Sequence, residues 1–180
     1  GWFLWYWTVM MAAMMLPSAW PMLLAHAQMA FATTRSRRQG ALSCTLFVLG
    51  YLFTWAAYGL VAYLLYSAIA ALQLDWLAWD RYGSVAAGVA VVAVGLYQFT
   101  PLKKSCLKHC LTPSSFIINH WRPGLAGALR MGVVHGAWCV GCCLGLMLLL
   151  FVLGIMSLVW MGIVTLLVFA EKIAPSRSMP

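Results

Sequence analysis

The stretch that decides the fold is residues 125–151, LAGALRMGVVHGAWCVGCCLGLMLLLF. Its only charged side chain, Arg130, lies near one end of this long apolar run. Because a helix rises about 1.5 Å per residue, about 20 apolar residues suffice to cross the ~30 Å hydrocarbon core of a bilayer. The run therefore predicts a transmembrane helix.

Four further apolar runs accompany it, at about residues 2–33, 42–72, 83–99 and 154–170. The chain is 64% hydrophobic and only 8% charged, whereas soluble domains carry about 25% charged residues. We therefore expect an all-α fold, a polytopic transmembrane bundle of about five spans forming one integral membrane domain over residues 1–180. Since the chain begins at Gly1 rather than at a methionine, we expect that a segment can precede it.

Two local features modify these helices. Pro17 and Pro21 interrupt the first run, and proline inside a helix removes a backbone donor and bends the helix, so this span is expected to be kinked. In the run 125–151, Gly132 with Gly136 and Gly141 with Gly145 are spaced four residues apart. This pattern lets helices approach closely, so we expect neighbouring helices to pack tightly there.

The basic residues predict the orientation. Eleven Lys and Arg face three Asp and Glu, and only Arg81 lies away from three connectors that would share one side of the membrane. The other ten are Arg35, Arg37, Arg38, Lys103, Lys104, Lys108, Arg122, Arg130, Lys172 and Arg177. By the positive-inside rule, this side and the C-terminus are predicted to be cytoplasmic, in a bacterial inner membrane. Glu171 and Lys172 are interpreted as interface anchors.

The first candidate site is the group His135, Cys139, Cys142 and Cys143. Thiolates and imidazoles favour copper(I), zinc or iron–sulfur clusters over hard ions, and we place copper(I) first and zinc second. His135 and Cys142 lie roughly 10 Å apart along a helix axis, so a second element or a second ion is required. The alternative is that buried cysteines pack as small hydrophobes.

The second candidate is the methionine series of the first run. The predicted metal ligands there are Met11, Met14, Met15 and His26. Met11, Met15 and His26 share one helical face with Met22 and Met29, which is typical of a conduit for a soft ion. Ordinary packing is the alternative, since methionine fills apolar cores.

The third candidate is Cys106, His109 and Cys110, which would share a face of a short helix in the basic loop. Lys104 and Lys108 are expected to lower the pKa of these thiols, which would favour metal binding or redox chemistry. The alternative is an ordinary pair of cytosolic thiols that neither binds metal nor takes part in redox chemistry. Cys44 and His120 have no partner in sequence and are interpreted as structural.

Several motifs together resemble a bacterial family of integral membrane proteins predicted to bind metal, whose substrate and activity are not established. The matching motifs are Trp7, Met11, Met14, Met15 and Pro17; Tyr97, Gln98, Thr100, Pro101, Leu102, Lys103, Cys106 and Cys110; Gly136, Cys139, Gly141, Cys142, Cys143, Leu146 and Met147; and Met156, Trp160, Met161, Glu171 and Lys172. The resemblance implies a multi-span helical fold and a metal site formed by Cys106, Cys110, Cys139, Cys142 and Cys143. His109 and His135 are added on chemical grounds.

Three functions follow as hypotheses. The first is a membrane protein that binds, handles or delivers copper(I), beside a soluble metal-carrying partner or within a larger membrane complex. The second is a thiol–disulfide or quinone-linked oxidoreductase using the pair Cys139 and Cys142. The third is an accessory subunit of a membrane complex. No phosphate-binding loop or paired carboxylate indicates hydrolysis or nucleotide binding, no nucleic-acid partner is expected, and no catalytic residue is predicted.

Overall fold

The structure, a computed structural model, describes residues 2–34, 36–71, 79–153 and 158–173. Within these ranges it contains helices and no strand, so the all-α prediction is confirmed. The helices are α1 (Trp2–Thr33), α2 (Arg37–Ala71), α3 (Trp79–Gln98), α4 (Pro101–Leu111), α5 (Pro113–His120), α6 (Leu125–Leu153) and α7 (Leu158–Ile173).

Three of these helices contain segments long enough and apolar enough to cross a membrane. The segments are Leu4–Thr33, Arg37–Leu65 and Leu125–Leu150, and a shorter apolar segment covers Gly88–Gln98 in α3. Many large apolar side chains on these helices are exposed, among them Phe53 and Val92. The expectation of five spans stays a prediction.

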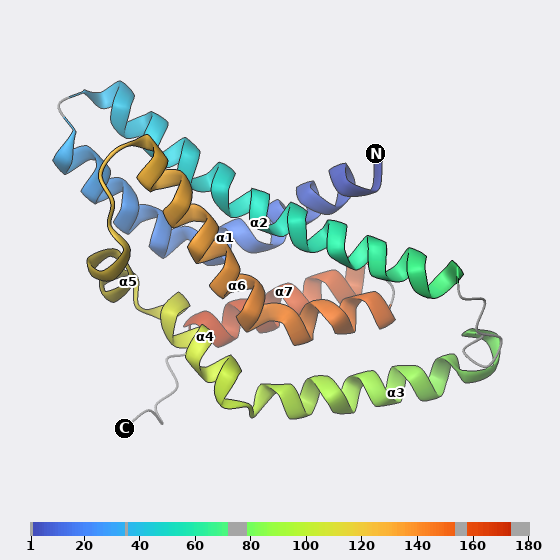
Figure 1. The fold of residues 1–180 in the computed structure, drawn as a ribbon. Coiled ribbons are helices and arrows are strands. Elements are labelled where there is room, and N and C mark those ends of the chain that lie inside the picture. Colours follow the sequence, from blue (N-terminus) through green and yellow to red (C-terminus); the bar gives the residue numbers. More distant parts are fainter. Residues whose placement is uncertain (1, 35, 72–78, 154–157, 174–180) are drawn as a thin grey trace.

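Helix α6 is the centre of the fold and contacts α2, α3, α4 and α7 (Figure 1). Its glycines allow these close approaches, as the sequence predicts. A Cβ atom at Gly132 would collide with the backbone carbonyl of Phe47, and one at Gly136 would lie 2.8 Å from the side chain of Thr54, both on α2. Helix α2 is therefore held directly against the backbone of α6.

Helix α1 is continuous through both internal prolines. Pro17 and Pro21 lie near its midpoint, and Figure 1 shows its two halves running in different directions. Its buried face packs against α2 and α7. The N-terminal half brings Met11 and Met15 toward α6, where both side chains are fully buried.

Helix α4 begins where the sequence signals a helix start. Thr100 caps it by accepting a hydrogen bond from the backbone N–H of Lys103, and Pro101 occupies the first turn, where a missing N–H costs nothing. The helix packs against α6, and a Cβ atom at Gly141 would lie 2.9 Å from the Cys106 sulfur. The predicted short helix of the basic loop is thus joined to the core.

The connectors that carry the basic residues gather at one end of the bundle. Figure 1 shows the α1–α2 connection, α4, α5, the start of α6 and the end of α7 on the same side, opposite the beginning of α3. Arg35 and Arg177 lie outside the described residues. The side of a membrane that this end faces stays a prediction.

Candidate metal centre

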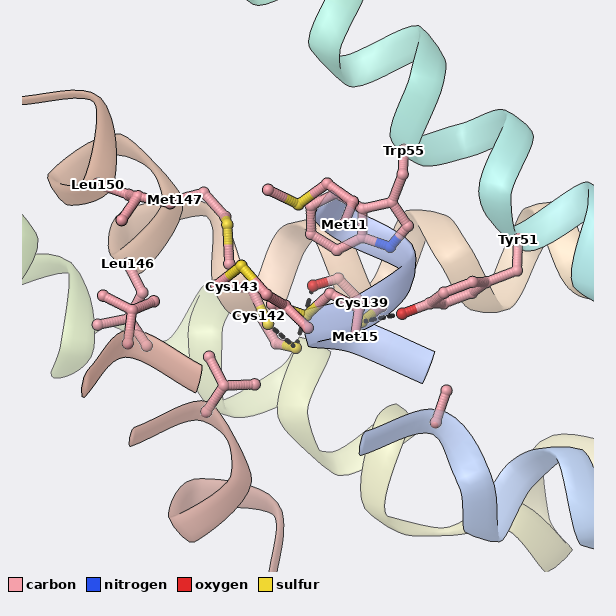
Figure 2. Packing of buried hydrophobic residues seen from close by; sticks show 14 of the residues in the cluster. Met11, Met15, Tyr51, Trp55, Cys139, Cys142, Cys143, Leu146, Met147 and Leu150 are labelled. Atoms are coloured by element: carbon pink, nitrogen blue, oxygen red, sulfur yellow. Dashed lines mark hydrogen bonds between the residues drawn. The ribbon is translucent and has the colours of Figure 1, made fainter. Parts of the chain in front are cut away.

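Three thiols from one stretch of α6 converge in the interior. The sulfur atoms of Cys139, Cys142 and Cys143 all lie within 4.8 Å of one another, and their residues are 0%, 2% and 2% exposed. Cys142 and Cys143 are 3.5 Å apart, and Cys142 also approaches the Cys139 carbonyl at 3.2 Å. Figure 2 shows the three side chains directed into one region between the helices.

A fourth thiol reaches this group from a second element. The Cys110 sulfur on α4 lies 3.7 Å from that of Cys142. With metal–thiolate bonds of about 2.3 Å, two sulfurs on the same ion lie about 4 Å apart. The separations of Cys142 from Cys143 and from Cys110 are close to this value, so the cluster needs little rearrangement to hold an ion.

Cys139 receives two further polar contacts. The Tyr51 hydroxyl on α2 lies 3.2 Å from its sulfur, and the Lys172 ammonium on α7 lies 3.4 Å from it (Figure 2 draws the Tyr51 contact). Donation from both groups would stabilise a thiolate at Cys139. The positive charge of Lys172 would also offset the net negative charge of a site in which several thiolates bind one metal ion.

Two polar contacts fix the end of α7 in this position. Lys172 donates a hydrogen bond to the Ser18 hydroxyl on α1 at 2.9 Å. The neighbouring Glu171 forms a 2.7 Å ion pair with Lys103 on α4, whose side chain is only 6% exposed. The interpretation of Glu171 and Lys172 as interface anchors stays a prediction, and the structure adds that both side chains bond to residues around the cluster.

Thioethers surround the thiols. Met11, Met14 and Met15 of α1 and Met147 of α6 belong to the same buried cluster as the cysteines (Figure 2 labels three of the four). Met11, Met15 and Met147 are 0% exposed. The methionines of α1 and the cysteines of α6 therefore meet in one part of the interior.

The basic-loop group divides between two surfaces of α4. Cys106 and Cys110 face the core with Lys103, while Lys104 and Lys108 are exposed on the opposite side. Burial raises the pKa of the Cys106 thiol. The hydrogen bond with Cys139, followed by burial, raises the pKa of Cys110. The expectation of lowered pKa values is therefore wrong, because the lysines point away from the thiols.

His109 takes a different role from the neighbouring cysteines. Its ring stacks on Trp138 with centroids 4.2 Å apart, and its Nδ1 lies 2.9 Å from the Ser105 carbonyl. Among the described residues, the close group of potential metal ligands contains the three α6 cysteines and not His109. The structure thus brings His109 beside the cluster without adding it to the group.

His135 and His26 lie in a neighbouring part of the core. His135 stacks near Phe47 and Tyr51, and His26 stacks on Phe47 with centroids 4.7 Å apart. Both histidines are buried, but neither is part of the close thiol group. Phe47 packs there with Met22 and with residues of α5 and α6.

Sequence reasoning missed Tyr51 and Lys172. Tyr51 lies four residues from both Phe47 and Trp55, and all three are buried, so an aromatic stripe in α2 was the available signal. A lysine that follows an apolar run usually extends to the membrane surface. Nothing in the spacing of Lys172 indicated that its ammonium would reach a cysteine of α6.

The fold and the cluster define a helical protein with a buried, sulfur-rich site suited to a soft metal ion. Residues 4–179 match the family described as PpoB2, copper chaperone, and the chain belongs to this family. No curated protein and no solved structure matches the sequence. The family supports the predicted metal binding and favours copper among the candidate ions.

Proposed function

We propose that this protein is an integral membrane copper(I) chaperone. Cys139, Cys142 and Cys143 hold the ion, and Cys110 is available as a fourth ligand. The observation that carries the proposal is the convergence of three buried sulfur atoms within 4.8 Å, in a chain of a copper chaperone family.

The chemistry of the donors supports copper(I). Thiolates and thioethers are soft ligands that select copper(I), and Met11, Met15 and Met147 pack around the thiols. Zinc is the second candidate, because four thiols at Cys110, Cys139, Cys142 and Cys143 also suit a tetrahedral zinc site. Metal analysis separates the two ions directly.

The grouping of more than two thiols favours metal binding over disulfide exchange. An oxidoreductase needs an attacking and a resolving thiol that reach an aqueous partner. Here Cys139, Cys142 and Cys143 are all buried, and Cys110 adds a fourth sulfur to the group. A metal ion uses three or four converging sulfurs, whereas a redox pair leaves the others without a role.

The surface of the helices supports insertion in a membrane. Three segments are long and apolar enough to span it, and their outward side chains include large exposed residues such as Phe53 and Val61. The gathering of basic connectors at one end supports a cytoplasmic location for that end and for the C-terminus. Cys110 on α4 then lies on the cytoplasmic side, where a soluble copper carrier or an acceptor in a larger membrane complex would dock.

The proposal is tested by copper content. The protein is purified in mild detergent, loaded with copper(I) under anaerobic reducing conditions, desalted and assayed for copper and zinc. We expect near-stoichiometric copper in the parent protein and loss of most of it in Cys142→Ser, because Cys142 contacts two other sulfurs of the cluster.

The matched control is Cys44→Ser. Cys44 is a half-buried free thiol on α2 and does not belong to the buried sulfur cluster. Its substitution should leave the copper content at the parental value. Equal copper in the parent and in Cys142→Ser, or zinc in place of copper, would refute copper(I) binding at the cluster.

A further inference from the structure

A row of soft donors continues along α6 beyond the thiols. Met131, His135, Cys139, Cys143 and Met147 follow one another at intervals of four residues, and each is 2% exposed or less. Residues four apart are neighbours on the helix surface, about 6 Å apart along the axis, and the row winds by about 40° around α6 at each step. The thiol cluster is therefore one part of a longer buried line of possible ligands.

Helix α1 extends this line on the facing side. Met22 belongs to the same buried group as Met131, packed around Phe47. His26 stacks on Phe47 with ring centroids 4.7 Å apart, and His135 stacks near the same ring at 6.0 Å. Two imidazoles stack on Phe47, and two thioethers belong to the same buried group.

Both imidazoles carry an unused nitrogen. Among the described residues, the Nδ1 atoms of His26 and His135 are buried without a hydrogen-bond partner. The other nitrogen of His26, Nε2, lies 3.2 Å from the Ser43 hydroxyl. Leaving a buried polar atom unpaired costs about 1–3 kcal/mol, and a role as ligands for a soft ion explains why two such atoms occur on rings that stack on the same Phe47.

A cavity reaches one member of this group, His26, from the surface. It has a volume of about 190 Å³, and His26 lines it together with Ser43, Thr33, Gln39 and Arg122. Thr33 and Gln39 are exposed, whereas His26 is 1% exposed. The cavity lies beside the α1–α2 connection, at the end of the bundle where the basic connectors gather.

We propose that copper(I) reaches the thiol cluster through this cavity, passing from His26 to His135 by way of the Met22 and Met131 thioethers. The path rests on the proposed function. Each step exchanges one neutral ligand for the next, and copper remains copper(I). At the last step a cysteine thiol releases its proton to solvent and binds as a thiolate, which holds the ion more firmly than the neutral donors do.

The charge at the cavity indicates the form in which copper arrives. Arg122 lines the cavity and disfavours a bare monovalent cation by repulsion. An anionic copper(I) complex is attracted instead, and its own ligands return to solvent as His26 takes the ion. The copper(I)–bicinchoninate complex has this charge and also reports copper transfer by loss of its visible absorbance.

The test measures the rate of loading. Detergent-purified protein is mixed with the copper(I)–bicinchoninate complex, and the absorbance is followed to its end point. His26→Phe and His135→Phe keep an aromatic ring for stacking but remove the ligand nitrogen. We expect each to load at least tenfold more slowly than the parent and to reach the same final copper content, because the thiol cluster is unchanged.

His120→Phe is the matched control. His120 stacks on Phe116 with centroids 4.6 Å apart and lines a separate cavity beside Met131, so this variant should load at the parental rate if copper enters by the His26 cavity, and slow loading would place the entrance beside His120 instead. Met131→Leu keeps the apolar shape, removes the thioether and should also slow loading. Thermal unfolding of every variant excludes slow loading that results from misfolding, and Met131→Leu is decisive if a histidine variant does not fold.

Three outcomes would overturn the path. Parental rates in the His26, His135 and Met131 variants would show that copper arrives elsewhere. A lower final copper content in His135→Phe at an unchanged rate would make His135 a storage ligand. Absence of copper from the parent protein would instead reject the proposed function, and with it the path, so the two failures are distinguishable.

Discussion

Replacement of Lys172 by methionine tests the electrostatic design of the site. The Lys172 ammonium lies 3.4 Å from the Cys139 sulfur, and hydrogen bonds to charged groups contribute about 1.5–3 kcal/mol. If copper(I) is bound by thiolates, Lys172→Met should weaken binding by about 10- to 100-fold, at 1.4 kcal/mol per tenfold. Tyr51→Phe removes a donor 3.2 Å from the same sulfur but no charge, so it should weaken binding by less than Lys172→Met does.

Competition with bicinchoninate measures these affinities in detergent. Lys172→Arg keeps the positive charge and should retain most of the parental affinity. Lys104→Met removes a lysine that is exposed on α4 and should change the affinity little. The reasoning is refuted if Lys172→Met binds copper(I) as tightly as the parent, or if Tyr51→Phe costs more affinity than Lys172→Met.

Three further predictions concern packing, ion pairing and pH. Gly132→Ala should lower the thermal unfolding midpoint in detergent by an amount equivalent to about 1–3 kcal/mol, because its Cβ meets the α2 backbone, whereas Gly95→Ala has open space and should not. Glu171→Gln should destabilise the fold by about 2 kcal/mol in the same assay, since it leaves the buried Lys103 ammonium unpaired. Copper(I) affinity should rise between about pH 6 and pH 8 in bicinchoninate competition, because protons compete for thiols such as Cys110, whose pKa is raised; a pH-independent affinity would contradict thiolate ligation.

The helices were predictable because their signal is local. The apolar runs indicate α1, α2 and α6 directly, and the Thr100–Pro101 start defines α4. The glycine spacing also predicted where α6 is approached closely, since Gly132 and Gly136 contact α2. These features depend on residues near one another in sequence.

The composition of the site was only partly predictable. Residues three and four apart lie on one face of a helix. The spacing of Cys139, Cys142 and Cys143 therefore predicted from sequence that the three thiols lie together. The approach of Cys110 depends on how α4 folds back onto α6, which is a tertiary contact. Lys172 is more distant still, because α7 must pack beside α6 before its ammonium can reach Cys139.

The charge of the site constrains how many thiols can bind as thiolates. A net charge is costly in a water-excluded interior, and Lys172 supplies one positive charge at Cys139, while Lys103 is already neutralised by Glu171. Copper(I) with two thiolates carries one negative charge, so Lys172 makes the whole unit neutral. Zinc reaches the same neutrality only with three thiolates. Copper(I) should therefore release about one proton fewer per bound ion than zinc, with the remaining sulfur donors bound as neutral thiols or thioethers.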